Sequence, residues 1–357
     1  MTLRDSTRTV KVGGVPLGGG APVSVQTMLN DDPHDPYALC SHLLRCAEAG
    51  ADIVRLTVPD IRAAEVLGEV RKRVPVPLVA DIHFDYRCAL AAIAAGADAL
   101  RLNPGNIGGT DKVRSVARAA KAAGIPIRVG VNGGSLEKGE TLVSSAIKHI
   151  KLLEDEGFRD IVVSVKASDV SSTVAAYREL AERTDCPLHL GLTEAGTFLR
   201  GAVHSSVALG VLLSEGIGDT IRVSLTDEPV KEVKTGLEIL RAVGLRAPGP
   251  SVTSCPTCGR TKCDVKGVAE QVENELEKIA AEFGASAVLP RVAVMGCVVN
   301  GPGEAKNADI ALCGGVGEFF LYEGGERRMR VSGQEAAGVV AEAARTWISC
   351  RRATKRV

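Results

Sequence analysis

The sequence is poor in aromatic residues, in net charge and in long apolar runs. Phe, Trp and Tyr make up 3% of the 357 residues, and 43 Lys and Arg balance 43 Asp and Glu. Such a chain has no strong field to attract a polyanion and few rings on which bases could stack. We therefore do not expect nucleic acid as a partner.

Signals for membrane insertion and export are also missing. No apolar run approaches the roughly 20 residues that a membrane helix needs, and the start, MTLRDSTR, lacks the apolar core of a signal peptide. We expect a cytoplasmic protein with no membrane partner. In that reducing compartment, the ten cysteines predict packing residues plus a metal or redox site instead of a disulfide framework.

Short β-branched runs alternate with Ala-rich stretches of helical periodicity, which is typical of parallel strands joined by helices. The runs are residues 23–27, 53–57, 78–81, 99–103, 127–131, 161–165, 188–192 and 220–223. Eight such units predict an α/β fold, a (β/α)8 TIM barrel over residues 1–244. The Gly- and Pro-rich segment 12–22 predicts a hairpin that closes the barrel bottom.

The segment LRAPGP at 245–250 predicts a linker, because its prolines and glycine stop the last barrel helix. Beyond it, the pattern predicts a helix at 267–283, a strand at 291–295, a hairpin at 319–331 and a helix at 334–349. This mixed order predicts a small α+β domain over 251–350, followed by a basic tail at 351–357.

Charged and polar residues close the eight runs, and in a barrel these positions meet at the mouth, where catalytic groups lie. Five of them are cations, which repel one another unless an anion compensates them. Arginine binds phosphate oxygens in a bidentate manner, so a phosphate or diphosphate ester is expected. The predicted substrate-binding residues are Arg55, Arg101, Asn103, Arg128, Asn132, Lys166, Arg222 and Ser224.

Two carboxylates, Asp81 and Glu194, stand at the same level of the predicted mouth. The alternative that every cation simply pairs with a rim carboxylate is weaker, because two acids cannot serve five cations. Glu194 could be a counterion, or a proton donor whose pKa is raised by partial burial. We favour the donor.

The second domain carries the motif Cys255-Pro-Thr-Cys258, and Cys297 in a Gly- and Pro-rich loop. A CxxC on such a turn can bring two thiolates to one metal. Zinc is one interpretation, but every histidine lies at or before His204, so this domain offers no imidazole. Cys297 is the best third ligand, whereas Cys263 and Cys313 could be a fourth ligand or small packing residues. Cys350 has no assigned role.

Four motifs closely resemble those of the 4-hydroxy-3-methylbut-2-enyl diphosphate synthase family. They are SCPTCGRT at 254–261, MGCVVNGPGE at 295–304, RLNPGNI at 101–107 and GDTIRVS at 218–224. The resemblance runs from about residue 10 to residue 347, without the extra middle domain of plant-type members. It implies the compact bacterial form, in which three cysteines and a glutamate hold a 4Fe-4S cluster. The implied ligands are Cys255, Cys258, Cys297 and Glu304.

The resemblance also implies the reaction, a two-electron reductive ring opening and dehydroxylation of 2-C-methyl-D-erythritol 2,4-cyclodiphosphate. Flavodoxin or ferredoxin would supply the electrons, and a homodimer would share its sites between subunits. The implied catalytic residues are Glu194 as proton donor, Asn300 near the substrate and Glu304 as an exchangeable ligand. Cys263 departs from the apolar or aromatic residue usual at its position.

Two other hypotheses about the function remain open from the sequence alone. A phosphate-ester or pterin-binding barrel transferase with an appended zinc domain would explain the barrel, but would leave Glu304 without a role. A non-enzymatic iron–sulfur sensor would explain the cysteines, but not the cations of the mouth.

Overall fold

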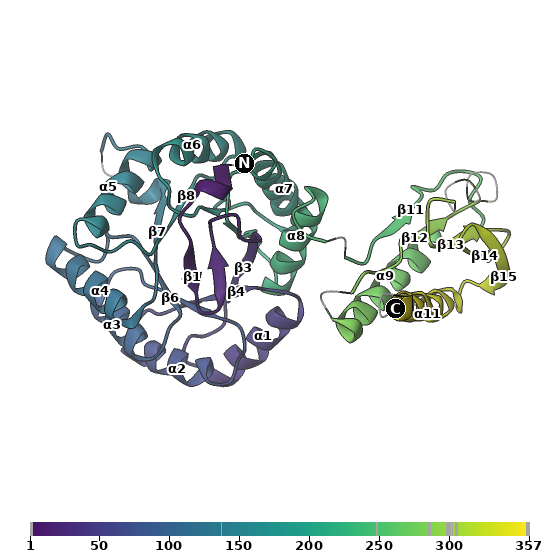
Figure 1. The fold of residues 1–357 in the computed structure, drawn as a ribbon, viewed down its shortest axis with the longest axis horizontal. Coiled ribbons are helices and arrows are strands. Elements are labelled where there is room, and N and C mark those ends of the chain that lie inside the picture. Colours follow the sequence, from purple (N-terminus) through teal and green to yellow (C-terminus); the bar gives the residue numbers. More distant parts are fainter. Residues whose placement is uncertain are drawn as a thin grey trace. The chain divides into compact units, whose positions relative to one another are not determined.

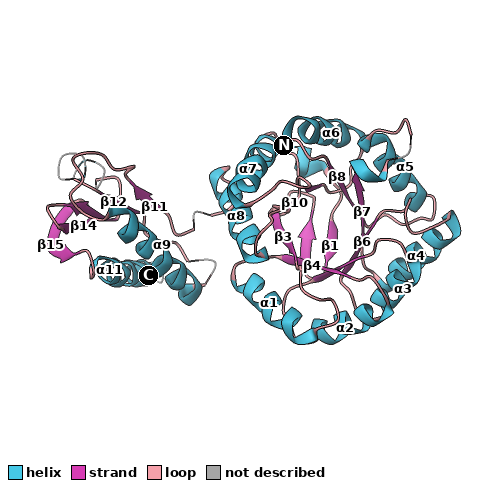
Figure 2. Cartoon of the chain, turned by 180° about the vertical axis from the view of Figure 1, so that it is seen from behind, coloured by secondary structure: helices cyan, strands magenta, loops and turns pink. Residues whose placement is uncertain are grey.

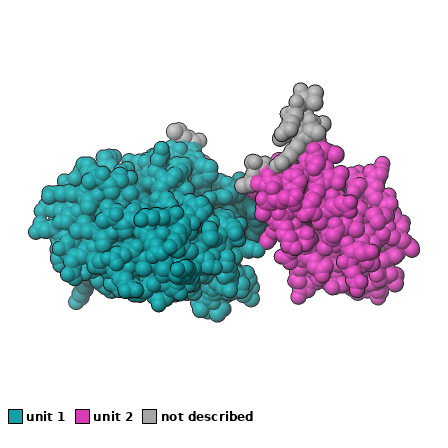
Figure 3. Space-filling model, turned by 90° about the horizontal axis from the view of Figure 1, so that it is seen from below, with its two compact units in different colours: residues 1–246 teal, residues 247–357 magenta. Residues whose placement is uncertain are grey.

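The structure is a computed structural model that describes residues 3–136, 138–247, 249–284, 287–297, 301, 303 and 306–354. The chain forms two compact units, residues 1–246 and 247–357 (Figure 3). Each unit is described by itself below.

The first unit is a (β/α)8 barrel, as predicted, with its strands inside a ring of helices (Figure 1). The strands are β3 (Ser24–Met28), β4 (Ile53–Thr57), β5 (Leu78–Asp81), β6 (Ala99–Leu102), β7 (Ile127–Asn132), β8 (Ile161–Lys166), β9 (His189–Leu190) and β10 (Thr220–Ile221). The helices are α1 (Pro36–Glu48), α2 (Ile61–Arg71), α3 (Tyr86–Ala94), α4 (Thr110–Ala123), α5 (Leu142–Glu154), α6 (Val170–Arg183), α7 (Phe198–Ser214) and α8 (Pro229–Ala242). Short 3-10 turns, η1 (Leu3–Ser6) and η2 (Gly133–Ser135), precede the barrel and follow β7.

All strand pairs of the barrel are parallel, in the order β8-β7-β6-β5-β4-β3-β10-β9. A parallel bridge between Val163 of β8 and Leu188, just before β9, closes the ring. The strands end where the helices begin, so the carboxyl ends of all eight strands meet at one mouth.

A hairpin of β1 (Val10–Val12) and β2 (Val15–Leu17) closes the opposite end of the barrel, as predicted (Figure 2). Val10, Val12 and Leu17 pack against a layer that points inward from the lower ends of the strands, including Ile53 and Ala99. Apolar side chains therefore fill the lower end of the barrel interior, and the polar groups of a binding site can be placed only in its upper part.

The chain leaves the barrel at the end away from the mouth. After α8, Arg246 pairs with Asp52, which lies directly before β4. Asp52 also accepts a hydrogen bond of 2.7 Å from the backbone N–H of Val25, near the start of β3. Residue 246, the last of the first unit, is thus fixed at the amino ends of the strands.

The second unit is a five-stranded mixed sheet with two long helices, which confirms the predicted α+β class. Its strands are β11 (Val252–Ser254), β12 (Val292–Met295), β13 (Ile310–Gly314), β14 (Glu318–Glu323) and β15 (Glu326–Ser332), in sequential order. The first three are parallel, and β14 and β15 form the predicted hairpin. Helices α9 (Val265–Phe283) and α11 (Ala336–Thr354) cover one sheet face with apolar side chains such as Val272, Leu276 and Val340.

Both helices differ from their predicted bounds. Helix α9 begins two residues earlier than predicted, because Asp264 caps it and accepts a hydrogen bond of 2.9 Å from the Gly267 N–H. Helix α11 continues past residue 349 to Thr354, so the start of the expected basic tail is helical. The Arg351 guanidinium lies 4.3 Å from the ring centre of Trp347, a cation–π contact that helps to extend the helix.

Candidate active site at the barrel mouth

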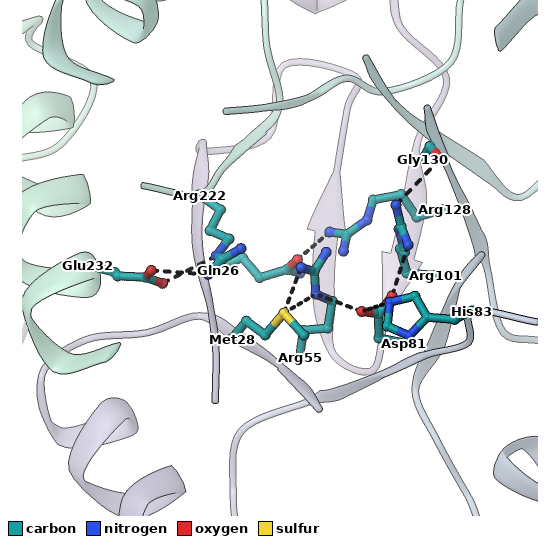
Figure 4. Close-up of polar contacts among 10 residues, drawn as sticks. All are labelled: Gln26, Met28, Arg55, Asp81, His83, Arg101, Arg128, Gly130, Arg222 and Glu232. Carbon is teal, nitrogen blue, oxygen red and sulfur yellow. Dashed lines mark hydrogen bonds and ion pairs between the residues drawn. The ribbon is translucent and has the colours of Figure 1, made fainter. Parts of the chain in front are cut away.

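The barrel mouth holds a cavity of about 260 Å³ lined mainly by polar side chains (Figure 4). Seven of the eight residues predicted to bind substrate line it: Arg55, Arg101, Asn103, Asn132, Lys166, Arg222 and Ser224. They come from β4, β6, β7, β8 and β10 and the loops that follow these strands. Barrel closure therefore brings together residues separated by up to 169 positions in the sequence.

Arg128 is the exception, since it does not line the cavity. It is the second residue of β7, 5% exposed, and its Nη1 donates to the Gln26 side-chain oxygen. Its Nε and Nη2 are buried without a hydrogen-bond partner among the described atoms. Arg128 thus lies below the cavity, where it adds positive charge to the floor.

Asp81 is the anion at the centre of the cationic array. Its carboxylate is 2% exposed, and lies 3.3 Å from Arg101 Nη1, 3.8 Å from Arg55 Nε and 3.3 Å from His83 Nε2. Burial alone would raise the pKa of Asp81, but Arg55, His83 and Arg101 outweigh burial and hold this pKa well below its usual range. Asp81 is therefore ionised, and it orients two guanidinium groups.

Arg55 has an additional partner in Met28 of β3. The Met28 sulfur accepts from Arg55 Nε at 3.0 Å and from Nη2 at 2.7 Å. A thioether is a weak acceptor that leaves the guanidinium charge uncompensated. The contact fixes the direction of Arg55 without neutralising it.

Sequence reasoning missed Glu232, the second carboxylate at the mouth. The expectation that only Asp81 and Glu194 stand at this level is wrong, because α8 directs Glu232 to Arg222, with oxygen–nitrogen distances of 3.0 and 3.2 Å. Glu232 is 2% exposed and also accepts from the Thr27 hydroxyl at 2.7 Å. A signal was present, since Glu232 shares the buried face of α8 with Val233 and Leu240.

The mouth keeps an excess of positive charge. Among the described residues, five basic side chains face two carboxylates, which leaves a formal charge of +3. Burial, and then the neighbouring guanidiniums, lower the pKa of Lys166 well below its usual value. Burial lowers the pKa of Arg55 to about 10 despite the attraction of Asp81. Such depressed pKa values mark a site that gains free energy by binding an anion.

Glu194 lies at the rim and not in the cavity. Its side chain is exposed, so the expected partial burial of this carboxylate is not found. The residue follows Thr193, which does line the cavity, and has a left-handed backbone with φ of 55°. This conformation is unusual for a residue other than glycine.

The thiol-bearing loops follow two neighbouring parallel strands of the second unit. Cys255 comes directly after β11, and Cys297 lies two residues after β12. The Gly296 N–H donates to the Cys255 sulfur at 3.2 Å, and the Arg260 backbone N–H lowers the pKa of the Cys258 thiol. These contacts favour thiolates, the soft ligands that iron–sulfur and zinc centres require. Asn300 and Glu304 lie outside the described residues.

The remaining cysteines of this unit have packed environments. Cys313 is fully buried on the sheet face away from the helices, where burial raises its pKa to about 11. Cys263 is half-buried, and its sulfur lies 3.8 Å from the Gly296 carbonyl oxygen. The described residues contain no group of three or more His, Cys, Asp or Glu side chains placed to hold a metal ion. The donor types fit a thiolate-bound centre, with Cys255, Cys258 and Cys297 as its described candidates.

A larger cavity of about 850 Å³ lies at the other end of the barrel. It is lined by residues of η1, α5 and α6 and by the segment before β10. It also includes Arg8, which pairs with both Glu154 and Asp185. Of the predicted site residues that the structure describes, none lines it. In the described part of the chain, no helix is both long and apolar enough to cross a membrane.

Together, the fold and the mouth define a class: a (β/α)8 barrel enzyme for an anionic substrate, with an added thiol-bearing α+β domain. The sequence matches the GcpE TIM-barrel domain over residues 7–237 and the GcpE protein C-terminal domain over residues 251–346. The chain belongs to the GcpE family.

Curated relatives of high identity support this membership. The 4-hydroxy-3-methylbut-2-en-1-yl diphosphate synthase (flavodoxin) of Geobacter sulfurreducens is 52% identical over 334 residues, which cover 91% of this chain and 93% of the relative. The enzyme of the same name from Maridesulfovibrio salexigens is 51% identical over 345 residues, with 94% of both chains covered. The predicted family and the predicted oxidoreductase of the non-mevalonate isoprenoid pathway are confirmed, and the transferase alternative is not favoured.

Solved structures confirm the barrel fold and nothing finer. Dihydropteroate synthase from Yersinia pestis has a TM-score of 0.50 at 16% identity, covering 66% of this chain and 97% of that chain. N-acetylneuraminic acid synthetase from Leptospira borgpetersenii has a TM-score of 0.50 at 12% identity, with 69% and 93% covered. Structural similarity at this level of sequence identity supports a conclusion about the fold alone.

Proposed function

We propose that the barrel mouth of this chain binds 2-C-methyl-D-erythritol 2,4-cyclodiphosphate, and that its second unit holds a 4Fe-4S cluster. The product is (E)-4-hydroxy-3-methylbut-2-enyl diphosphate. Ring opening breaks one C–O bond to the diphosphate, and the neighbouring hydroxyl leaves as water. The balance requires two electrons and one proton per substrate molecule.

The observation that carries the proposal is the charge of the mouth. Each phosphorus of a cyclic diphosphate keeps one ionised oxygen, so the substrate is a dianion. The mouth has a formal charge of +3, and Arg55, Arg101, Lys166 and Arg222 all line the cavity. In a site shielded from water, charge-assisted hydrogen bonds from these groups would hold the diphosphate firmly.

Neutral donors complete the substrate site. Asn103 and Asn132 line the cavity on the side of β6 and β7, and Ser224 lines it beside β10. These side chains can bind the hydroxyl groups and bridging oxygens of a cyclic diphosphate. The cations would therefore fix the diphosphate, and the amides would orient the carbon skeleton.

The cluster would be held by Cys255, Cys258, Cys297 and Glu304, and when bound it would supply electrons one at a time. The N–H groups directed at the sulfurs of Cys255 and Cys258 would stabilise thiolates there. Relatives named as flavodoxin-dependent enzymes support flavodoxin as the donor, with ferredoxin as the alternative. Asn300 would assist the substrate, and Glu194 would supply the proton from the rim.

A homodimer in the cytoplasm is part of the proposal. The chain leaves the barrel at the end opposite to the mouth, where Arg246 pairs with Asp52, and the predicted linker has only six residues. This favours a site in which the second unit of a partner chain serves the mouth, in a reciprocal two-fold arrangement.

The first experiment tests the cofactor and the reaction together. The protein, purified without oxygen, should contain about four iron and four sulfide ions per chain. It should convert the cyclic diphosphate to the linear diphosphate with reduced flavodoxin. A colourless zinc protein without this turnover would refute the proposal.

The second experiment tests the shared site. Arg101→Met/Arg222→Met, which weakens the mouth, is mixed with Cys297→Ala, which removes a proposed ligand, under conditions in which subunits exchange. If sites are shared, each heterodimer keeps one intact site, and statistical mixing restores about a quarter of wild-type activity. If heterodimers form and activity stays at the level of the parent variants, the shared site is wrong.

A further inference from the structure

Strand β7 has a gap in its inward-facing side chains at the level of the mouth. Side chains alternate along a strand, so Arg128, Gly130 and Asn132 of β7 face the barrel interior. Arg128 lies below the cavity and Asn132 lines it. Gly130, between them, has no side chain, and the Arg101 guanidinium from β6 occupies that space (Figure 4).

The distances show how completely Arg101 fills the gap. A Cβ atom at position 130 would lie 2.6 Å from Arg101 Nε, 2.9 Å from Nη2 and 3.0 Å from Cζ. All three distances are shorter than normal van der Waals contact. A side chain as small as a methyl group at residue 130 and the present position of Arg101 therefore exclude each other.

Two contacts fix Arg101 in this place. Its Nη1 lies 3.3 Å from Asp81 on β5, and its Nη2 lies 3.5 Å from the Gly130 carbonyl oxygen on β7. The guanidinium is thus held between the two neighbouring strands, with 15% of its side chain exposed toward the cavity. That remaining exposure is what a substrate oxygen could use.

Backbone conformation does not explain the glycine. Gly130 is absent from the described residues with positive φ, and it lies within a regular parallel pairing in which Gly130 is opposite Ser164. Any residue could adopt this extended backbone. The space that Arg101 occupies is therefore the reason for glycine at this position.

We propose that Gly130 is a positioning residue: its missing side chain lets the Arg101 guanidinium lie flat over β7 and face the diphosphate. The inference rests on the proposed substrate, because it assigns Gly130 to that same site. Only the far end of a flexible side chain blocks a Cβ here. An alanine would therefore displace Arg101 and leave the strand in place.

A second glycine at the mouth repeats the arrangement. A Cβ at Gly191 would lie 2.7 Å from Lys166 Nζ and 2.6 Å from the Arg222 carbonyl oxygen. The backbone oxygen cannot move as a side chain can, so alanine at 191 would disturb folding as well as Lys166. Gly130 therefore offers the clean test.

The experiment uses the full chain and compares Gly130→Ala, Arg101→Met and the double variant. Affinity for the cyclic diphosphate and for inorganic pyrophosphate is measured by calorimetry. Gly130→Ala should weaken both by roughly tenfold to a hundredfold, as expected for a displaced charged hydrogen bond. The double variant should bind as Arg101→Met does, since there is then no guanidinium left to displace.

Gly68→Ala is the matched control. Gly68 is a buried glycine of α2, and a Cβ there would lie 2.9 Å from the Ala95 carbonyl oxygen, away from the mouth. This variant should lose stability and keep wild-type affinity for both ligands. Gly130→Ala should instead lose affinity for both ligands. A loss of stability that leaves affinity unchanged in Gly68→Ala therefore separates positioning from a general folding defect.

Two binding results would overturn the inference: wild-type affinity in Gly130→Ala, or an equal loss of affinity from Gly130→Ala in the presence and absence of Arg101. A crystal structure of Gly130→Ala tests the placement without any ligand. An Arg101 side chain in its original position would reject the inference, whatever the substrate. Failure of the wild-type protein to bind the cyclic diphosphate would instead count against the proposed function.

Discussion

Replacing Asp81 by Asn should strongly destabilise the barrel. The carboxylate is 2% exposed and compensates both Arg55 and Arg101. The change leaves five cations with Glu232 alone, and raises the formal charge of the mouth from +3 to +4. Breaking a buried ion pair on one side typically costs about 3–5 kcal/mol, and we expect a loss in this range.

The pH dependence has a definite sign. The pKa of Asp81 is lower in the folded chain than the value of about 3.9 in an unfolded one. Its contribution is therefore present in full above that unfolded pKa and is lost as the pH falls through the folded pKa. The stability difference between wild type and Asp81→Asn should shrink below about pH 4.

The chain provides its own control for this measurement. Its single tryptophan, Trp347, lies in α11 of the second unit, so its fluorescence reports the unfolding of that unit. Circular dichroism in urea reports the helices of both units. Asp81→Asn should move the barrel transition to lower urea and leave the fluorescence transition in place. Equal shifts of both transitions, or a barrel loss below about 1 kcal/mol, would refute the reasoning.

Four further changes probe the remaining groups. Lys166→Met should stabilise the ligand-free barrel, because burial and the neighbouring guanidiniums lower the pKa of native Lys166. The change should also remove part of the gain in stability that wild type shows as pH rises toward 10, and thermal unfolding across pH measures both effects. Arg222→Met should weaken binding of the cyclic diphosphate by about 1.5–3 kcal/mol in calorimetry, and unchanged affinity on folded protein would contradict this role. Cys258→Ala should lower the iron and sulfide content, whereas Cys313→Ala should keep the cluster at a cost in stability; the opposite outcome would reverse their assigned roles.

The barrel could be predicted from the sequence because each strand carries a local signal. Runs such as 53–57 and 78–81 coincide with β4 and β5, since β-branched residues bounded by glycine and proline favour buried parallel strands. Seven cavity-lining residues followed from the rule that strand ends meet at the mouth. That rule needs only the order of residues along each strand, which the sequence contains.

What could not be predicted depends on distances between elements. Arg128 on β7 is the register partner of Arg101 on β6, yet only Arg101 lines the cavity. Barrel strands are tilted, so register partners on neighbouring strands lie at different heights along the barrel axis. Glu232 reaches the mouth from a helix and so escapes a search of strand ends. Gly130 contributes no functional group, and its role is to leave space for the Arg101 guanidinium. A search of the sequence for functional groups would therefore not find it.

The charge of the mouth also predicts the relative affinities of the site for the product and for the substrate. Opening the ring converts one bridging oxygen into a terminal phosphate oxygen, and a phosphate monoester carries about 1.5–2 negative charges at pH 7. The linear diphosphate is thus more anionic than the dianionic ring, and it matches a formal mouth charge of +3 more closely. We expect the product to bind more tightly than the substrate, and its release to limit turnover.

Moderate salt should then accelerate steady-state turnover while weakening substrate affinity, because screening lowers the attraction to both anions. Competition experiments between product and substrate measure the ratio directly. A product that bound more weakly than the ring, with turnover that only fell as salt increased, would show that the excess charge does not control release.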